Sequence, residues 1–240
     1  MDEIEELRQN IALVEERIAR ACENAGRRRE EVTLVAASKM NDAARVKAAH
    51  RAGITVFGEN KVQEYTAKNA ESAYEGAKIH IIGHLQKNKV KYVAGQVDLI
   101  ESVDSVELLR ALEQRCAALG KEQDVLVEVN LAGEESKTGL DPAKLDELLC
   151  AAGTLSFVRV QGLMTMAPKL ETSAERRAYF CQMYELFVDI RAKKYDNVKM
   201  VELSMGMSGD FEEAIAEGAT MVRLGTAIFG ARNYGTVGCT

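Results

Sequence analysis

The sequence predicts a closed, parallel (β/α)8 barrel of the TIM type, with an extra helix at its N-terminus. Eight short apolar runs that lack polar alternation, as in strands buried on both faces, are separated by amphipathic segments of helical period. The spacing between successive strands averages about 30 residues, which suits repeated βα units. Eight such units favour a closed barrel, whereas an open doubly wound sheet is the alternative that uses the same alternation.

The elements follow one another in a regular order. In the first helix, residues 4–24, apolar side chains recur three or four positions apart. The strands are expected at residues 32–37, 54–57, 79–82, 97–100, 125–129, 158–163, 200–203 and 221–224. The later helices are expected at residues 42–53, 60–75, 86–95, 105–119, 142–152, 173–194 and 209–217. Helix starts are indicated at Asp104, Asp141 and Thr172, and helix ends near Gly120, Gly153 and Gly218.

The chain shows no sign of an internal boundary. It has only two prolines and no stretch rich in glycine, proline or serine that would act as a linker. A length of 240 residues, 47% of them hydrophobic, is enough for one large core. We therefore expect one domain over residues 1–240, and we expect the chain to be a monomer.

Charge and hydropathy argue against two classes of partner. The net charge is -6 with a sequence pI near 5.3, so the chain lacks the basic character of a nucleic-acid-binding protein. No apolar run reaches the roughly 18–20 residues that span a bilayer. The N-terminus is charged throughout and lacks the basic start and apolar middle of a signal peptide. We expect a cytoplasmic protein that binds neither nucleic acid nor membrane.

The cysteines and histidines do not predict a metal site. The five cysteines form no CxxC pair and are expected to be reduced, and most of them to be small buried side chains. His80 and His84 are four residues apart, but they lie in IHIIGHL, which is expected to form a strand and its exit. A helical pair of metal-binding histidines is therefore not expected.

Lys39 is the strongest single candidate for chemistry. It follows the apolar run VTLVAAS, at the carboxyl end of the first strand, and active sites of such barrels lie at this end. A poorly solvated lysine has a lowered pKa, and its neutral amine can attack a carbonyl group. The alternative is a lysine whose stem packs at the strand end while its ammonium group reaches solvent.

A phosphate site is expected after the last two strands. Barrels commonly bind phosphate at these loops, and SMGMSGD and RLGTAIFG carry glycines that let backbone N–H groups approach an anion. Hydroxyl groups of Ser204, Ser208 and Thr226 are available as donors, and GTAIFG could open a short helix whose N-terminus attracts phosphate. Ordinary turn glycines and capping serines would give the same pattern.

Six stretches, read together, resemble the pyridoxal phosphate homeostasis protein family, which is related to the N-terminal barrel of alanine racemase. They are LVAASK, FGENKVQE, HIIGHLQKNK, GLMTM, LSMGMSGD and VRLGTAIFG, they occur in the family's order, and they span residues 30–234. The resemblance implies pyridoxal 5′-phosphate (PLP) as cofactor. One departure is the absence of tryptophan, since many members have Trp where Ile79 stands.

The resemblance also implies a set of cofactor contacts. Lys39 would hold the PLP aldehyde as a Schiff base and Asn60 would lie beside the ring. Ser204, Gly225 and Thr226 would bind the phosphate. Arg223 would be a cationic ligand, either of the ring nitrogen or of the phosphate, and both alternatives stay open at this point.

The function that the resemblance implies is the holding and delivery of PLP, with apo forms of PLP-dependent enzymes as possible acceptors and with no catalytic residue assigned. Alanine racemase needs a second, β-rich domain that supplies a catalytic tyrosine, and we expect no room for one in this chain. Two alternatives are a PLP enzyme such as a weak amino-acid racemase and an aldolase-type barrel that forms a Schiff base without a cofactor.

Overall fold

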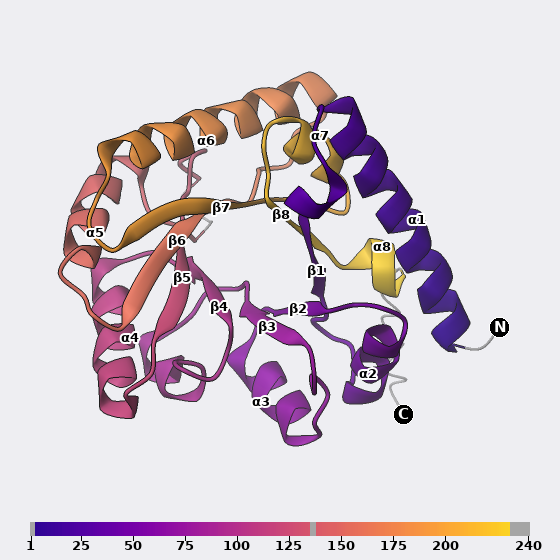
Figure 1. Ribbon diagram of the computed structural model, residues 1–240, viewed down its shortest axis with the longest axis horizontal. Coiled ribbons are helices and arrows are strands. Elements are labelled where there is room, and N and C mark those ends of the chain that lie inside the picture. The colour runs from indigo at the N-terminus through magenta and orange to yellow at the C-terminus, as the bar shows by residue number, and fades with distance from the viewer. Residues whose placement is uncertain (1–2, 135–137, 231–240) are drawn as a thin grey trace, which may run out of the picture.

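The computed structural model of the protein describes residues 3–134 and 138–230. Its eight strands are all parallel and close into a barrel in the order β1 to β8, with β8 pairing with β1 (Figure 1). The predicted barrel is therefore confirmed. The strands are β1 (Thr33–Ala37), β2 (Val56–Glu59), β3 (Lys78–Ile81), β4 (Leu99–Val103), β5 (Gln123–Glu128), β6 (Val158–Met164), β7 (Val198–Met207) and β8 (Met221–Leu224).

Alternation along the strands separates two apolar layers. Positions such as Leu34, Ala36 and Phe57 belong to the large core between the strands and the surrounding helices. The alternate positions face the barrel axis and form two smaller clusters, which are Val35, Ala37, Val56 and Ile82 on one side and Leu99, Leu126, Met164 and Met221 on the other. The barrel is thus a packed core with no pore, and its site can only lie at a rim.

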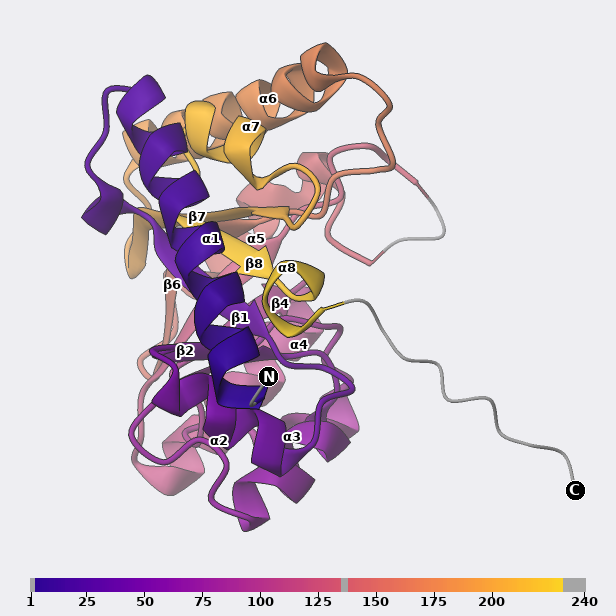
Figure 2. The ribbon, with the colours of Figure 1, turned by 90° about the vertical axis from the view of Figure 1, so that its right-hand side faces the viewer.

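The helices wrap the outside of the barrel. They are α1 (Glu3–Asn24), α2 (Ala43–Arg51), α3 (Val62–Ala70), α4 (Val106–Leu119), α5 (Leu145–Ala152), α6 (Ser173–Lys193), α7 (Phe211–Ala216) and α8 (Thr226–Phe229). The extra helix α1 is present as predicted and packs against α2, α7 and α8, as the side view shows (Figure 2). Within the described ranges, no helix has both the length and the apolar character that a membrane span requires.

The helix starts follow capping chemistry, with one correction. Thr172 caps α6 in a capping box with Glu175, and Asp141 caps a short 3-10 helix, Pro142–Lys144, that runs into α5. The sequence predicts that Asp104 starts the helix over residues 105–119. In the structure the N-cap of this helix, α4, is Ser105, whose hydroxyl accepts a hydrogen bond from the Leu108 N–H. Two adjacent capping residues cannot be ranked by sequence alone.

Several elements differ from the prediction in kind or length. The segment expected as a helix over residues 86–95 is a 3-10 helix, Lys87–Tyr92, and the buried residues Val90 and Val93 match its three-residue period. Strand β7 was expected to end at residue 203 but runs on to Met207, with a register shift against β8 between Ser204 and Met207. Because the pairing is irregular here, the pattern of apolar residues does not indicate where the strand ends. Ser208 is the first residue after the strand.

Candidate functional site

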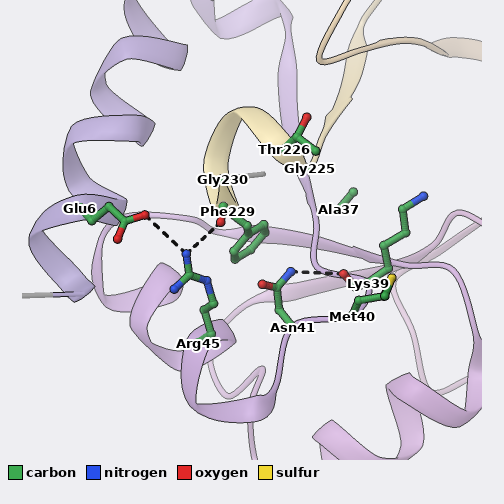
Figure 3. A pocket seen from close by; sticks show the side chains of 10 residues that line it. All are labelled: Glu6, Ala37, Lys39, Met40, Asn41, Arg45, Gly225, Thr226, Phe229 and Gly230. Carbon is green, nitrogen blue, oxygen red and sulfur yellow. Dashed lines mark hydrogen bonds and ion pairs between the residues drawn. The ribbon is translucent and has the colours of Figure 1, made fainter. Parts of the chain in front are cut away.

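A cavity of about 450 Å³ opens where the first and last strands end (Figure 3). It brings together three residues that the sequence singled out, Lys39, Gly225 and Thr226, although they are almost 190 positions apart along the chain. Its remaining lining comes from α1, the end of β1, the loop before α2, α2 itself and the end of α8: Glu6, Ala37, Met40, Asn41, Arg45, Phe229 and Gly230. Figure 3 shows Lys39 extending away from Arg45, which turns toward Glu6 and the Phe229 carbonyl.

A buried polar cluster fixes the residue before Lys39. The Ser38 hydroxyl donates to Glu59 Oε1 at 2.5 Å, and Lys68 Nζ donates both to the same oxygen, at 2.7 Å, and to the Ser38 carbonyl, at 2.8 Å. The Tyr74 hydroxyl makes a third contact to Glu59 Oε1, at 2.8 Å, and burial together with the Glu59 charge raises the pKa of the Tyr74 hydroxyl. The second carboxylate oxygen, Glu59 Oε2, is buried and has no hydrogen-bond partner within residues 3–134 and 138–230.

The residues after Lys39 are held as firmly. The Met40 N–H donates to Glu64 Oε2 at 2.8 Å, and Met40 itself has a φ of 63°, a left-handed conformation that is uncommon for a residue with a side chain. The Asn41 side-chain amide donates to the Lys39 carbonyl at 3.2 Å. Helix α3 and strand β2 therefore clamp the backbone on both sides of Lys39 and set the direction of its side chain.

The opposite wall is the start of α8. The backbone N–H groups of Gly225 and Ala227 both donate to the Ser208 hydroxyl, at 3.3 and 3.4 Å. A Cβ atom at position 225 would lie 3.3 Å from the Ala37 carbonyl, so a larger residue would crowd β1. A hydroxyl and two backbone donors that converge in front of a helix start are suited to an anion.

Arg223 lies inside the barrel and below that wall. Its Nη1 donates to the Ser204 hydroxyl at 2.6 Å and its Nη2 to the Thr165 carbonyl at 2.8 Å. Burial lowers the pKa of the guanidinium, while the charges of Glu101, Glu128 and Asp210 oppose that shift. The side chain is 3% exposed, so these contacts fix its place.

Ser204 and Arg223 belong to a longer polar chain. The Ser204 hydroxyl donates to Glu101 Oε2 at 2.6 Å, and His80 Nδ1 is 2.7 Å from Glu101 Oε1. Burial would raise the pKa of Glu101, but the hydrogen bond from His80 and the charges of His80 and Arg223 outweigh it and keep this pKa below its ordinary value. Ser204 is thus engaged with Glu101 and Arg223 and does not line the cavity.

Asn60 is half-buried and follows strand β2 on the same rim. Its backbone passes so close to the next strand's exit that a Cβ atom on Gly83 would lie 2.4 Å from the Asn60 carbonyl oxygen. A glycine is therefore required at position 83 for the two loops to pack. Like Ser204 and Arg223, Asn60 is outside the set of residues that line the cavity.

Another buried carboxyl group was missed by sequence reasoning. Glu128 ends β5, is 2% exposed, and accepts a hydrogen bond from the Thr138 hydroxyl at 2.7 Å through Oε1, while Oε2 has no partner among the described residues. Burial raises the pKa of Glu128. The available signal was the position of Glu128 at the end of β5. The sequence VEVN does not indicate, however, whether this glutamate faces the barrel axis or solvent.

Comparison with known proteins shows the family of the chain. The family model for the alanine racemase N-terminal domain matches residues 4–233. A pyridoxal phosphate homeostasis protein of Aquifex aeolicus is 43% identical over 226 residues, which is 94% of this chain and 98% of that protein.

Solved structures resemble the chain over most of its length. A protein of unknown function from Bifidobacterium adolescentis matches with a TM-score of 0.87 and 40% identity, over 95% of this chain and 97% of that one. PipY of Synechococcus elongatus with PLP bound matches with a TM-score of 0.78 and 38% identity, over 83% and 93%.

A more distant match shows the fold alone. Alanine racemase of Clostridium difficile is 15% identical with a TM-score of 0.67, and the match covers 95% of this chain but only 57% of the racemase. The match to the family model and the identity to the Aquifex protein together show that this chain belongs to the alanine racemase N-terminal domain family, among the pyridoxal phosphate homeostasis proteins.

Proposed function

We propose that this chain binds PLP at the rim formed by β1, β7 and β8 and acts in PLP homeostasis, by holding the cofactor and delivering it. The observation that carries this proposal is the single cavity that Lys39 shares with Gly225 and Thr226, where backbone N–H groups at the start of α8 are available to an anion. PLP needs both, because it is an aldehyde with a phosphate group. The PLP-bound structure of PipY, a relative of 38% identity, supports the same cofactor.

The phosphate would be held by Thr226, the N–H groups of Gly225 and Ala227, and Ser208. This set replaces Ser204 with Ser208, because Ser208 already contacts both N–H groups while Ser204 is committed to Glu101 and Arg223. The phosphate would take the place of the Ser208 oxygen as acceptor of the two backbone hydrogen bonds, and the Ser208 hydroxyl could then turn to donate.

Arg223 would donate a hydrogen bond to the ring nitrogen of PLP, and the phosphate would be bound by the groups at the start of α8. Its nitrogen contacts in the described part of the chain, to Ser204, the Thr165 carbonyl and Glu101, lie inside the barrel, and none of them reaches Ser208. A permanently charged guanidinium can donate a hydrogen bond to the ring nitrogen but disfavours its protonation. A ring held unprotonated withdraws electrons poorly, which suits a carrier. Asn60, on the same rim, would lie beside the ring.

We propose that the chain is a carrier, without substantial enzymatic turnover. It spans 98% of the length of the Aquifex homeostasis protein but 57% of the racemase, whose further part it does not match. We further propose that it works in the cytoplasm as a monomeric, single cofactor-binding unit and that apo PLP-dependent enzymes receive its PLP.

The first test locates the attachment point. The purified protein should show the yellow absorbance of lysine-bound PLP, which an aldolase-type barrel without cofactor would lack. Borohydride reduction and peptide mapping should place the pyridoxyl label on Lys39. Lys39→Ala should lose the yellow band but keep some PLP through the phosphate wall. Lys61→Ala, at an exposed lysine of a neighbouring loop, is the matched control and should keep both band and label. A label mainly on another lysine would contradict the proposal.

The second test separates a carrier from a racemase. Incubation of the PLP-loaded protein with L-alanine in deuterated water should give little α-deuteration and no inversion, because inversion needs an acid/base group on each face of the cofactor and Lys39 supplies one face. Exchange with inversion at an ordinary enzyme rate, about 1–1000 per second, would overturn the carrier assignment.

A further inference from the structure

The 3-10 helix after β3 carries three lysines, which we call the lysine patch. Residues 84–92 contain Lys87, Lys89 and Lys91 and no aspartate or glutamate. Lys87 and Lys91 are exposed and Lys89 is half-buried. The Nζ atoms of Lys89 and Lys91 lie 5.9 and 5.0 Å from the ring centroid of Tyr92. In the described part of the chain, no carboxylate lies within ion-pairing distance of the three ammonium groups.

The lysine patch and the proposed cofactor site lie on two sides of the same end of α3. Lys89 shares a small pocket of about 220 Å³ with Val62, the first residue of α3. The same end of α3 also reaches the residue that follows Lys39, because the Met40 N–H donates to Glu64 Oε2 at 2.8 Å. A helix with its side chains is about 10–12 Å wide, so the patch is close to the rim where PLP would enter, without lining the cavity.

The patch opposes the charge of the molecule as a whole. The chain has a net charge of -6, which at long range repels an anion such as the phosphate of PLP. The carboxylates near the patch have partners: Glu64 Oε2 lies 3.8 Å from Lys68 Nζ, and Asp104 lies 3.2 Å from His84 Nδ1. Charges act over about 30 Å at an ionic strength of 0.01 M and over about 8 Å at 0.15 M. The patch can therefore act on an approaching anion that it does not touch once bound.

We propose that the lysine patch steers PLP toward its site: it attracts the phosphate group of the approaching ligand and raises the rate of binding. This inference rests on the proposed function. It assigns a role to residues that lie outside the cavity. Charges of opposite sign beside a site speed association by about 10- to 1000-fold, and three exposed lysines on an acidic protein should lie at or below the lower end of this range.

The first test uses the wild-type chain. Stopped-flow mixing with excess PLP follows the growth of the yellow band and gives a second-order rate constant. We expect this constant to fall at least about threefold between ionic strengths of about 0.01 and 0.15 M, because salt screens the attraction. The net charge alone would make it rise. Pyridoxal forms the same Schiff base but lacks the phosphate, so salt should hardly change its rate.

A pair of triple variants assigns the attraction to the patch. The patch variant replaces its three lysines with glutamine. The matched control removes as many positive charges at the amino-terminal end of the barrel, from exposed lysines at or next to the starts of β3, β5 and β7: Lys78→Gln, Lys121→Gln and Lys199→Gln. At about 0.01 M ionic strength the patch variant should bind PLP at least about threefold more slowly than wild type, and the control less than about twofold more slowly. Neither variant should change the rate with pyridoxal.

The outcomes are distinct. Steering by the patch is wrong if the wild-type rate rises with salt, if the patch variant binds PLP as fast as wild type, or if both triple variants slow PLP equally. Equal slowing of PLP and pyridoxal in the patch variant would also overturn it, because the variant would then have damaged the site itself. In each of these cases the proposed function stands as long as the yellow band forms. If the wild-type chain gives no PLP band, the proposed function fails and steering fails with it.

Discussion

At the scale of single residues, the hydrogen-bond partners of buried carboxyl groups decide their charge. Glu101 and Glu128 both end up inside the barrel, at 0% and 2% exposure. Glu101 receives hydrogen bonds through both oxygens, and its pKa lies below the ordinary value. Glu128 has a partner for one oxygen only, and its pKa is raised by burial. The same side chain therefore serves as a fixed anion in one place and holds its proton more tightly in the other.

Glu128→Gln should stabilise the protein at neutral pH. In the unfolded chain Glu128 ionises near its ordinary pKa of about 4.3, whereas the folded state holds the proton to higher pH. Ionisation above the ordinary pKa therefore favours unfolding, and this penalty grows as pH rises until it is complete above the folded pKa. Glutamine cannot ionise, so we expect a gain of about 1 kcal/mol in the free energy of unfolding at pH 8 that disappears near pH 4.

Urea denaturation at a series of pH values measures this difference. Glu185→Gln, at an exposed position on α6, should follow the wild-type pH dependence and serves as the control. A Glu128→Gln protein that is less stable than wild type at pH 8 would show that the carboxylate has a partner beyond Thr138 and is needed as an anion.

The residues that line the cavity were predicted from the sequence more accurately than the buried residues that hold them in place. Lys39, Gly225 and Thr226 were predictable because strand ends and glycine-bearing loops mark the rim of a barrel. Ser204 and Ser208 could not be separated, because the choice depends on a register shift in β7 that leaves no trace in composition. Which of the predicted residues bind PLP is still a prediction.

At the scale of elements, strands were predicted more accurately than the helices between them. All eight strands overlap the apolar runs that indicated them, although β2 and β4 lie two to three residues further along the chain, because parallel strands buried on both faces need continuous apolar sequence. The 3-10 helix Lys87–Tyr92 was missed as such, since lysines at three of its six positions leave few apolar residues to define a period. Short helices depend on tertiary packing, which local sequence does not record.

Helix α3 has a role that follows from its contacts rather than from its sequence. Lys68 on α3 is 6% exposed and joins Glu59 of β2 to the carbonyl of Ser38, directly before Lys39. The helix thereby ties the ends of β1 and β2 together beneath the proposed cofactor. Since the Glu59 carboxylate already has one oxygen without a partner, it depends on the Lys68 charge.

Lys68→Met should therefore be costly. The variant leaves a buried carboxylate without its counter-ion, a change that typically costs about 3–5 kcal/mol. We expect a loss of that size in urea denaturation at pH 7. The matched control is Arg177→Met, which removes a 2.7 Å ion pair with Glu217 at an arginine 59% exposed, and it should cost at most about 1 kcal/mol. Equal losses in the two variants would mean that the α3 contact is no more than a surface ion pair.

At the scale of the whole molecule, the closed barrel is what makes a site from distant segments. Strand β8 pairs with β1, so Ala36 lies opposite Leu224 and the residues just beyond them, Lys39 and Gly225, reach the same rim. Helix α1 covers this junction from outside, and the Asn10 side chain donates to the Ile228 carbonyl of α8 at 3.0 Å. A ligand that contacts both sides of the junction should therefore stabilise the entire fold.

PLP should raise the melting temperature more than pyridoxal does. A ligand at 100 times its Kd adds about 2.7 kcal/mol to the stability of the folded state, which corresponds to about 5–10 °C for a domain of this size. Pyridoxal can still react with Lys39 but lacks the phosphate that the N–H groups of Gly225 and Ala227 would bind. Hydrogen bonds to a charged group contribute about 1.5–3 kcal/mol each, so pyridoxal should bind at least about tenfold more weakly and give roughly half the shift at the same concentration. Thermal unfolding with either ligand measures this, and inorganic phosphate alone is the control for nonspecific anion effects.

The same comparison in Lys39→Ala isolates the contribution of the phosphate: PLP should still stabilise this variant, while pyridoxal should not. Equal shifts from PLP and pyridoxal in the wild-type chain would mean that the α8 wall does not bind the phosphate and that Lys39 alone retains the cofactor.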